Sequence, residues 1–184
     1  EVITLGWATG RKVRIRHRSL RSDRAYDYVL SPYLIELWGP GSAAYVIGHA
    51  SYFDALRTFK LERIEEAELL QETFELPPGF DPAGLLGRAW GIMYGEEERE
   101  VVLRFTPAVA RRVCETVWHP SQEIEQQPDG RCILRVRVAH TLEMKPWIRS
   151  WGPECEVLAP ADLRAEIADE LRRAAQVYEG GGSA

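Results

Sequence analysis

The sequence predicts an α+β protein in two parts: a small β-barrel or sandwich, then a ferredoxin-like βαββαβ domain with an extra C-terminal helix. Short extended segments separated by Gly and Pro turns fill the first half, whereas helical and extended patterns alternate in the second half. A Pro-Pro-Gly break at residues 77–79 separates the two halves. We therefore expect domains at 1–78 and 99–178, a linker with a short helix at 79–98, and a flexible tail at 179–184.

The first half predicts the end of a helix followed by short strands. Residues 3–9 have helical character, and Gly10 is expected to stop the helix. Residues 12–18 alternate: Val13, Ile15 and His17 share one face and three arginines share the other, which is typical of a half-buried strand. Further extended segments are expected at 26–37, 44–50 and 56–61, with a turn at 38–41.

The second half predicts the element order β-α-β-β-α-β-α after the short helix of the linker. The hairpin is marked by Pro128-Asp129-Gly130, and the last helix by an apolar stripe that begins at Leu163 and Ile167. The helices are expected at 82–90, 107–118, 141–151 and 160–178. The strands are expected at 100–105, 121–127, 132–140 and 154–158.

The composition is that of a soluble globular protein, because 45% of the 184 residues are apolar and 28% are charged. The net charge of -5 argues against a protein that coats nucleic acid along its whole surface. The charge is unevenly distributed, however. Residues 11–24 hold seven Lys or Arg and one acid, while residues 62–75 hold six Glu and one Arg. The basic segment at 11–24 predicts a local basic surface that attracts anions.

Neither cofactor nor metal is predicted, and the chain carries no familiar catalytic motif. The three cysteines, an odd number without a C-x-x-C pair, favour a reducing, cytoplasmic location. The histidines are too far apart in sequence for metal-ligand spacing. No apolar run reaches the length of a membrane span. These observations favour a protein that is neither an enzyme nor a membrane protein.

One cluster has binding chemistry. In the segment 56–63, alternation places Arg57, Phe59, Leu61 and Arg63 on one face. Two arginines on either side of an aromatic ring can hold a phosphate and stack a base. Alternatively, the arginines pair with a neighbouring acid, and the sequence alone leaves both interpretations open.

Several motifs resemble those of a known family. The sequence Arg-Thr-Phe-Lys-Leu-Glu-Arg-Ile at 57–64 resembles the characteristic segment of WYL domains, and Pro-Tyr-Leu-Ile at 32–35 and Tyr-Val-Ile-Gly at 45–48 precede it in the family order. Further downstream, Trp-His-Pro-Ser-Gln at 118–122 and Ser-Trp-Gly-Pro at 150–153 resemble the WCX extension. The name-giving triplet is Ala-Tyr-Val here, His17 replaces a usual Tyr, and Tyr28 replaces a frequent Arg.

The resemblance implies an Sm/SH3-like barrel in the first half and the ligand-sensing part of a bacterial transcription regulator. It implies a homodimer that binds a short single-stranded DNA or RNA fragment, or a nucleotide-like effector, and that reaches operator DNA through a preceding helix-turn-helix domain. The implied ligand-binding residues are Ser19, Tyr45, Arg57 and Arg63, with His17 as a substituted member. Arg104, Arg135 and Arg137 are candidates for extending a basic groove.

Two other functions stay open at this point. The first is a structural dimerisation module without a ligand, in which the apolar stripes serve subunit contact alone. The second is an enzyme such as a nuclease, which the lack of a carboxylate or histidine metal cluster in the sequence disfavours.

Overall fold

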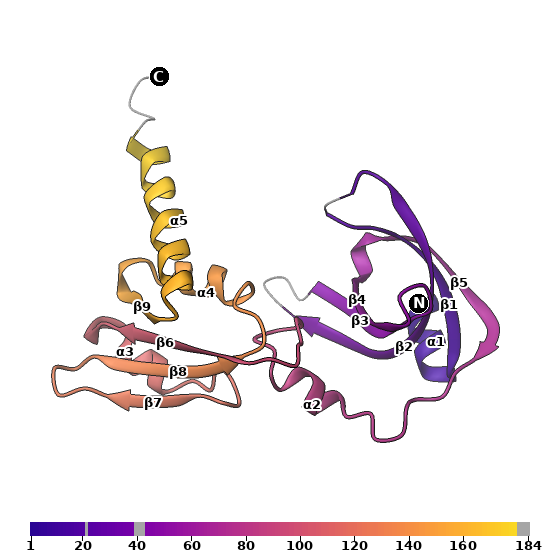
Figure 1. The fold of residues 1–184 in the computed structure, drawn as a ribbon, viewed down its shortest axis with the longest axis horizontal. Helices are drawn as coiled ribbons and strands as arrows, with labels where there is room; N and C mark the ends of the chain where they lie inside the picture. Colours follow the sequence, from indigo (N-terminus) through magenta and orange to yellow (C-terminus); the bar gives the residue numbers. More distant parts are fainter. Residues whose placement is uncertain (21, 39–42, 180–184) are drawn as a thin grey trace. The chain divides into compact units, whose positions relative to one another are not determined.

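The computed structural model describes residues 1–20, 22–38 and 43–179. The chain divides into two compact units, Glu1–Pro82 and Ala83–Ala184 (Figure 1). The expected turn at 38–41, apart from Trp38, and the expected tail beyond Glu179 lie outside the described residues. None of the helices in the described ranges combines the length and apolar character that crossing a membrane requires.

The first unit contains one helix and a five-stranded antiparallel sheet. Helix α1 spans Val2–Thr9 and ends, as predicted, at Gly10, whose φ of 64° is left-handed. The strands are β1 Arg11–Arg18, β2 Ala25–Trp38, β3 Ala43–Ala50, β4 Ala55–Lys60 and β5 Ile64–Thr73. Their order in the sheet is β4-β3-β2-β1-β5 (Figure 1). The strands at both edges are thus sequence neighbours, joined by a 3-10 turn at Leu61–Arg63.

The alternation predicted for β1 is confirmed. Val13 and Ile15 are fully buried and His17 is 9% exposed, while the arginines between them face solvent. Because the side chains of a strand alternate between its faces, this pattern directs one face of β1 into the core. The residues that complete this core come from α1, β2, β3 and β4: Ile3, Leu30, Val46, Ala50 and Phe59.

Strand β5 was not predicted, since its four glutamates suggested a solvated acidic run. The strand forms because it pairs antiparallel with the basic β1, with Arg14 opposite Glu68 and Arg16 opposite Glu66. Within the described residues, no ladder joins β4 to β5, so the sheet is not a closed barrel. The first unit therefore has the α+β composition that the sequence predicts, with an open sheet instead of the expected closed one.

The second unit follows the predicted element order. Helix α2, at Pro82–Leu86, precedes a four-stranded antiparallel sheet ordered β7-β8-β6-β9. The strands are β6 Arg99–Phe105, β7 Glu123–Gln126, β8 Cys132–Val138 and β9 Cys155–Ala159. The helices are α3 Pro107–Cys114, α4 Met144–Ser150 and α5 Ala161–Glu179, and a 3-10 turn lies at Gly152–Glu154. The hairpin turn between β7 and β8 contains Gly130 with a φ of 84°, as its Pro-Asp-Gly sequence predicts.

Three helices are shorter than predicted. Helix α2 ends before Gly87, a residue type that disfavours helix interiors, instead of reaching residue 90. Helix α3 ends at Cys114 instead of 118, because the indole N–H of Trp118 donates to the carbonyl of Val113 at 3.0 Å and closes the helix end. Helix α4 begins at Met144, three residues later than expected, and ends at Ser150.

Candidate ligand-binding site

The basic segment at the start of the chain is largely neutralised by the fold. Lys12 lies 3.0 Å from a carboxylate oxygen of Glu72, and Arg14 forms an ion pair with Glu68. Further along β1, Arg18 lies 2.6 Å from Glu65. The pairing of a basic strand with an acidic strand thus cancels much of the local positive field that the sequence predicts at 11–24. We refer to these pairs as the β1–β5 ion-pair ladder.

Arg57 and Arg63 differ from these cations. Within the described residues, neither guanidinium forms an ion pair with a carboxylate, and the neighbouring Glu65 is engaged by β1 instead. Arg57 is exposed on β4 and donates a hydrogen bond of 2.8 Å to the carbonyl of Leu56. Its guanidinium carbon lies 4.6 Å from the centre of the Phe53 ring. Both positive charges therefore remain available to an anion.

The single face predicted for residues 57–63 is wrong in part. Strand β4 ends at Lys60, and the 3-10 turn that follows interrupts the alternation before Arg63. Phe59 is 5% exposed and belongs to the core, so its ring is not free to stack a base. Arg63 is instead placed by the turn, where its charge acts on His17 of β1.

His17 is a buried polar residue with an unused atom. The side chain is 9% exposed, and its Nε2 has no hydrogen-bond partner among the described residues. The ring contacts Phe59 edge-on, with 5.1 Å between the ring centres. Burial lowers the pKa of His17 below its usual 6.5, and the nearby positive charge of Arg63 lowers it further. A buried nitrogen without a partner is costly, and protein atoms cover Nε2 in this structure, so a ligand would reach it only after these atoms move.

An aromatic row runs from the buried Phe59 to the ring beneath Arg57, and sequence reasoning missed most of it. Starting from Phe59, the rings of Tyr28, Phe53 and Tyr52 follow in contact. Tyr28 lies 5.4 Å from Phe59 and stacks on Phe53 at 5.5 Å. The row combines β2, the β3–β4 turn and β4, which are neighbours only in the folded sheet, so no local sequence pattern could reveal it.

Ser19 and Tyr45 lie at different places relative to this row. Ser19 directly follows β1 and is exposed, two residues beyond His17. Tyr45 lies opposite Lys60 in the β3–β4 pairing, whereas the buried Val46 lies opposite Phe59. Since successive side chains of a strand point to opposite faces, Tyr45 lies on the face of β3 away from Phe59.

The three arginines predicted to extend a basic groove, all in the second unit, each have an acidic partner. Arg104 forms an ion pair with Glu156, which also lies 2.8 Å from Arg164. The other two, on β8, pair across the sheet with acids of β7, and both distances are 3.9 Å: Arg135 with Glu125 and Arg137 with Glu123. All three lie on the face of the sheet away from the core, in the arrangement of solvated strand arginines.

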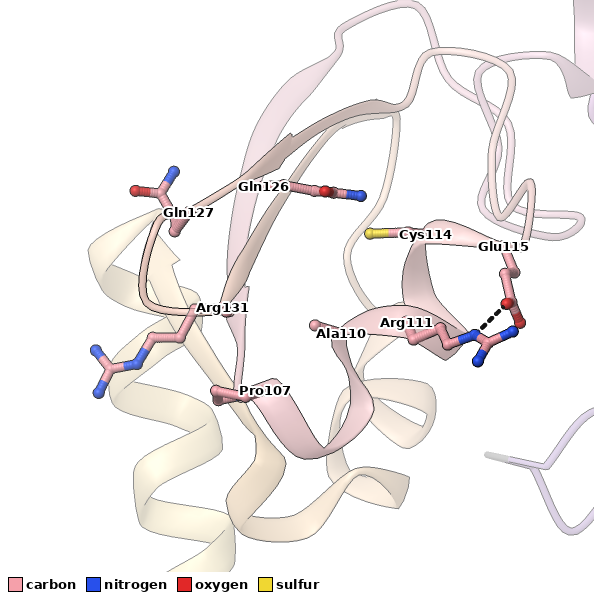
Figure 2. Close-up of a pocket in the computed structure, with 9 residues that line it drawn as sticks. Pro107, Ala110, Arg111, Cys114, Glu115, Gln126, Gln127 and Arg131 are labelled. Atoms are coloured by element: carbon pink, nitrogen blue, oxygen red, sulfur yellow. Dashed lines mark hydrogen bonds and ion pairs between the residues drawn. The ribbon is translucent and has the colours of Figure 1, made fainter.

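A cavity of about 430 Å³ lies elsewhere in the second unit, between α3 and the β7–β8 turn (Figure 2). Its two arginines already have acidic partners: Arg111 lies 2.7 Å from Glu115 and Arg131 lies 3.5 Å from Asp129. In Figure 2 the side chain of Arg131 also points away from Ala110. Despite its size, this cavity offers an anion less uncompensated charge than the Arg57–Arg63 region does.

The lowered pKa of His17 predicts a pH dependence of stability. The unfolded chain binds a proton near pH 6.5, where the folded chain still holds His17 neutral, so stability falls as the pH drops below 6.5. Replacing His17 by Phe removes this titration and keeps a ring against Phe59. We expect the melting temperature of the wild type to fall more than that of His17→Phe between pH 7.5 and 5.5. Equal losses in both proteins would show that His17 is not the titrating group.

Comparisons with known proteins follow the two units closely. The model of the WYL domain matches residues 1–69, and the model of the WCX domain matches residues 97–175. A search among curated proteins finds no match. Within the described ranges, no three His, Cys, Asp or Glu side chains are grouped as they would be around a metal ion.

Two solved structures are similar to the chain. One is the proteasome accessory factor B/C (PafBC) of Arthrobacter aurescens, with 21% identity and a TM-score of 0.36 over 90% of this chain and 24% of that one. The other is described as a CRISPR Cas-related protein, with 12% identity and a TM-score of 0.60 over 99% of this chain and 51% of that one. The chain thus spans about half the length of the second protein and a quarter of the first. From the two matched domains, the chain belongs to the WYL-domain family, with its WYL domain followed by a WCX domain.

Proposed function

We propose that the chain is the effector-sensing and dimerisation part of a bacterial transcription regulator. Its effector would be a short single-stranded oligonucleotide or a nucleotide-like phosphorylated ligand, bound by the WYL domain. The observation that carries the proposal is the pair Arg57 and Arg63, which lack acidic partners among the described residues while the cations of β1 are paired. Membership of the WYL-domain family supports a regulatory role.

The chemistry of the site suits a phosphate. A guanidinium presents a planar fork of N–H donors that matches two phosphate oxygens. His17 stays in the proposed site as the neighbour of Arg63, and its buried Nε2 would meet a ligand only after the side chains around it move. Ser19 is proposed as a peripheral hydrogen-bond donor because it follows the strand that carries His17. Tyr45 is not included in this phosphate site, since its pairing with Lys60 directs its side chain to the face of the sheet opposite to Phe59.

The proposal extends to regulation and to the finer architecture. In it, the chain forms a homodimer, and the effector changes the dimer geometry and so the affinity of a preceding domain for operator DNA. The sheet order of the first unit supports an open variant of an Sm/SH3-like barrel at 1–78. The order β7-β8-β6-β9 supports a ferredoxin-like domain at 99–178, after a linker at 79–98.

The test is the fluorescence anisotropy of a labelled short single-stranded DNA, and of its RNA counterpart, titrated with the chain. Arg57→Ala and Arg63→Ala are each expected to weaken binding about tenfold or more, because each removes a charge-assisted hydrogen bond to phosphate. The logarithm of the association constant is expected to fall linearly with the logarithm of the salt concentration, with a slope of about -1.4. This is the slope for two phosphate contacts on a single strand.

Arg14→Ala is the matched control, because it removes an exposed arginine of the same sheet that already has an acidic partner. Its effect on affinity is expected to be small. The site would be wrong if Arg57→Ala lowered the melting temperature sharply while oligonucleotide affinity stayed unchanged. That result would show that Arg57 is a structural residue.

A dimerisation module without a ligand is the second candidate, favoured by the last turns of α5. Leu163 and Ile167 are buried in the second unit, but the stripe continues at Leu171, which is 37% exposed. Val177 and Tyr178 near the helix end are 73% and 86% exposed. In Figure 1 this part of α5 extends beyond the rest of its unit. A dimer in size-exclusion chromatography that binds no nucleotide or oligonucleotide would favour this candidate.

A further inference from the structure

The geometry points to a nucleobase-stacking subsite at the β3–β4 turn, formed by the ring of Tyr52 and supported by Phe53 and Tyr28. The inference rests on the proposed function and narrows it, because it requires a ligand with a base attached to its phosphate. Phosphate contacts alone would need only the arginines. The subsite would select single-stranded nucleic acid or nucleotides over other phosphorylated metabolites.

The turn that carries Tyr52 is held by its backbone and by a polar pair. The amide of Phe53 donates to the carbonyl of Ala50 at 3.0 Å, and the amide of Ser51 donates to Val29 at 3.0 Å. Asp54 has a φ of 48°, which is rare for a residue other than glycine, and its carboxylate lies 3.1 Å from Nε2 of His49. The aromatic side chains are therefore not what closes this turn.

Both aromatic residues of the turn are exposed instead of packed into the core. Tyr52 is 79% exposed and Phe53 is 39% exposed. Hairpin turns are usually formed by Gly, Asn, Asp and Ser, which need no burial. Two neighbouring large rings at such a position leave apolar surface in water, and this surface is most readily explained by a partner that covers it.

The three rings are arranged in space as a stacking site requires. The Phe53 ring is already occupied, because it stacks on Tyr28 at an interplanar angle of 25° and lies beneath the guanidinium of Arg57. Tyr52 stands edge-on to Phe53, with 5.0 Å between ring centres and an angle of 88°, and edge-on to Tyr28 at 6.2 Å. These contacts orient the Tyr52 ring, and its 79% exposure leaves room for a flat ligand against it.

Charge identifies the occupant. The open ring lies next to Phe53, which supports the cation of Arg57, and that cation has no acidic partner among the described residues. An anionic group tethered to a planar ring fits this combination, and a nucleotide is such a molecule. The one acid of the turn, Asp54, is engaged with His49. A second copy of this chain, with a net charge of -5, complements the cation less specifically.

The experiment compares two fluorescein-labelled probes of equal length and equal phosphate number, one oligothymidylate and one made of abasic sites. The full chain is titrated with each probe, and so are Tyr52→Ala and Tyr52→Phe. Tyr178→Ala is the control, because it removes an exposed tyrosine from the other unit. Melting curves confirm that the variants are folded, as expected for a residue that is 79% exposed.

We expect the wild type and Tyr52→Phe to bind the oligothymidylate about tenfold more tightly than the abasic probe, since one stacked base contributes about that factor. Tyr52→Ala is expected to lose this preference but to keep its affinity for the abasic probe. Equal binding of both probes by the wild type would overturn the subsite and leave the phosphate site intact. Binding of neither probe would overturn the subsite for oligonucleotides and, with it, the oligonucleotide form of the proposed function. A change from dimer to monomer in Tyr52→Ala would assign the ring to subunit contact and also overturn the subsite.

Discussion

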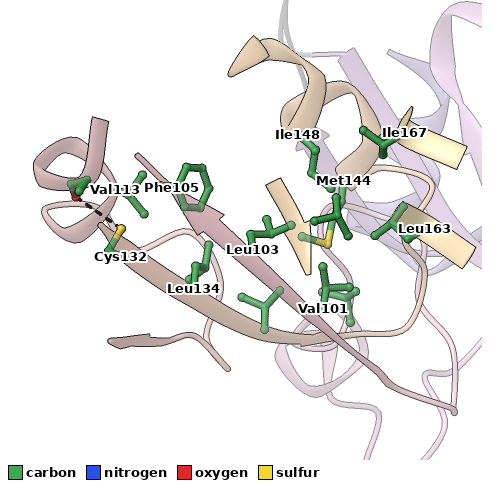
Figure 3. Close-up of a cluster of buried hydrophobic side chains, with 14 residues drawn as sticks. Val101, Leu103, Phe105, Val113, Cys132, Leu134, Met144, Ile148, Leu163 and Ile167 are labelled. Carbon is green, nitrogen blue, oxygen red and sulfur yellow. Dashed lines mark hydrogen bonds between the residues drawn. The ribbon is translucent and has the colours of Figure 1, made fainter. Parts of the chain in front are cut away.

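Replacing Phe105 by alanine is expected to lower the free energy of unfolding of the second unit by about 3–5 kcal/mol. Phe105 is fully buried at the end of β6, and its ring contacts Trp147 and Trp151 edge-on, with 6.0 Å and 5.4 Å between ring centres. Figure 3 shows it among the core residues Val113, Cys132 and Leu134. Alanine would leave a cavity between the sheet and the helices that the rigid neighbours fill only in part.

Urea unfolding followed by tryptophan fluorescence measures this loss. Four of the six tryptophans belong to the second unit and pack against its core: Trp90, Trp118, Trp147 and Trp151. Val117→Ala is the control, because Val117 is 82% exposed and its truncation should change stability by less than about 0.5 kcal/mol. A similar small effect for Phe105→Ala would mean that the Phe105 ring does not fill the core as described.

Replacing Gly48 by valine is expected to destabilise the first unit by about 3 kcal/mol or more. Even a Cβ atom at this position would lie 2.2 Å from the backbone oxygen of Ser31 and 3.0 Å from Pro32. The backbone of β2 would have to move, because a main-chain oxygen cannot turn aside as a flexible side chain can. Since Gly48 pairs with Arg57, the same displacement is expected to weaken ligand binding.

Hydrogen exchange measured by mass spectrometry locates the effect of Gly48→Val. Faster exchange is expected in peptides from β2 and β3, while peptides from β6 and β8 keep their protection. Leu37→Ala serves as the control on the same sheet, because Leu37 is 63% exposed. Unchanged exchange in β2 and β3 would contradict the close approach of the two backbones.

The parts of the fold that follow a simple period were predictable, and those that depend on pairing were not. The alternation of β1 and the first half of the α5 stripe matched burial, because each reflects one face turned to a core. Strand β5 was not predicted because the charges of its glutamates are neutralised by arginines of β1, a strand about fifty residues earlier in the sequence. Helix ends were misplaced where a distant side chain, such as the Trp118 indole, closes the helix.

The candidate site was likewise predictable only in part. Arg57 and Arg63 could be named from their motif, but the sequence could not decide between an acidic partner and a free charge. In the structure Glu65 forms ion pairs with Arg16 and Arg18 of β1. Among the described residues it is therefore not the partner of Arg57 or Arg63. Tyr52 and Phe53 gave no signal, because their contacts with Tyr28 arise from the meeting of β2 with the β3–β4 turn.

The β1–β5 ion-pair ladder has a consequence for the rate of encounter. Long-range attraction of an anion depends on a field that extends beyond the surface. A chain with a net charge of -5, whose basic strand β1 is paired with acids, produces little of it. An anionic effector would then arrive at about 10⁵–10⁶ M⁻¹ s⁻¹, the range of associations without electrostatic steering. Tight binding would have to come from slow dissociation, so a regulator of this design would hold its signal well after the free effector had declined.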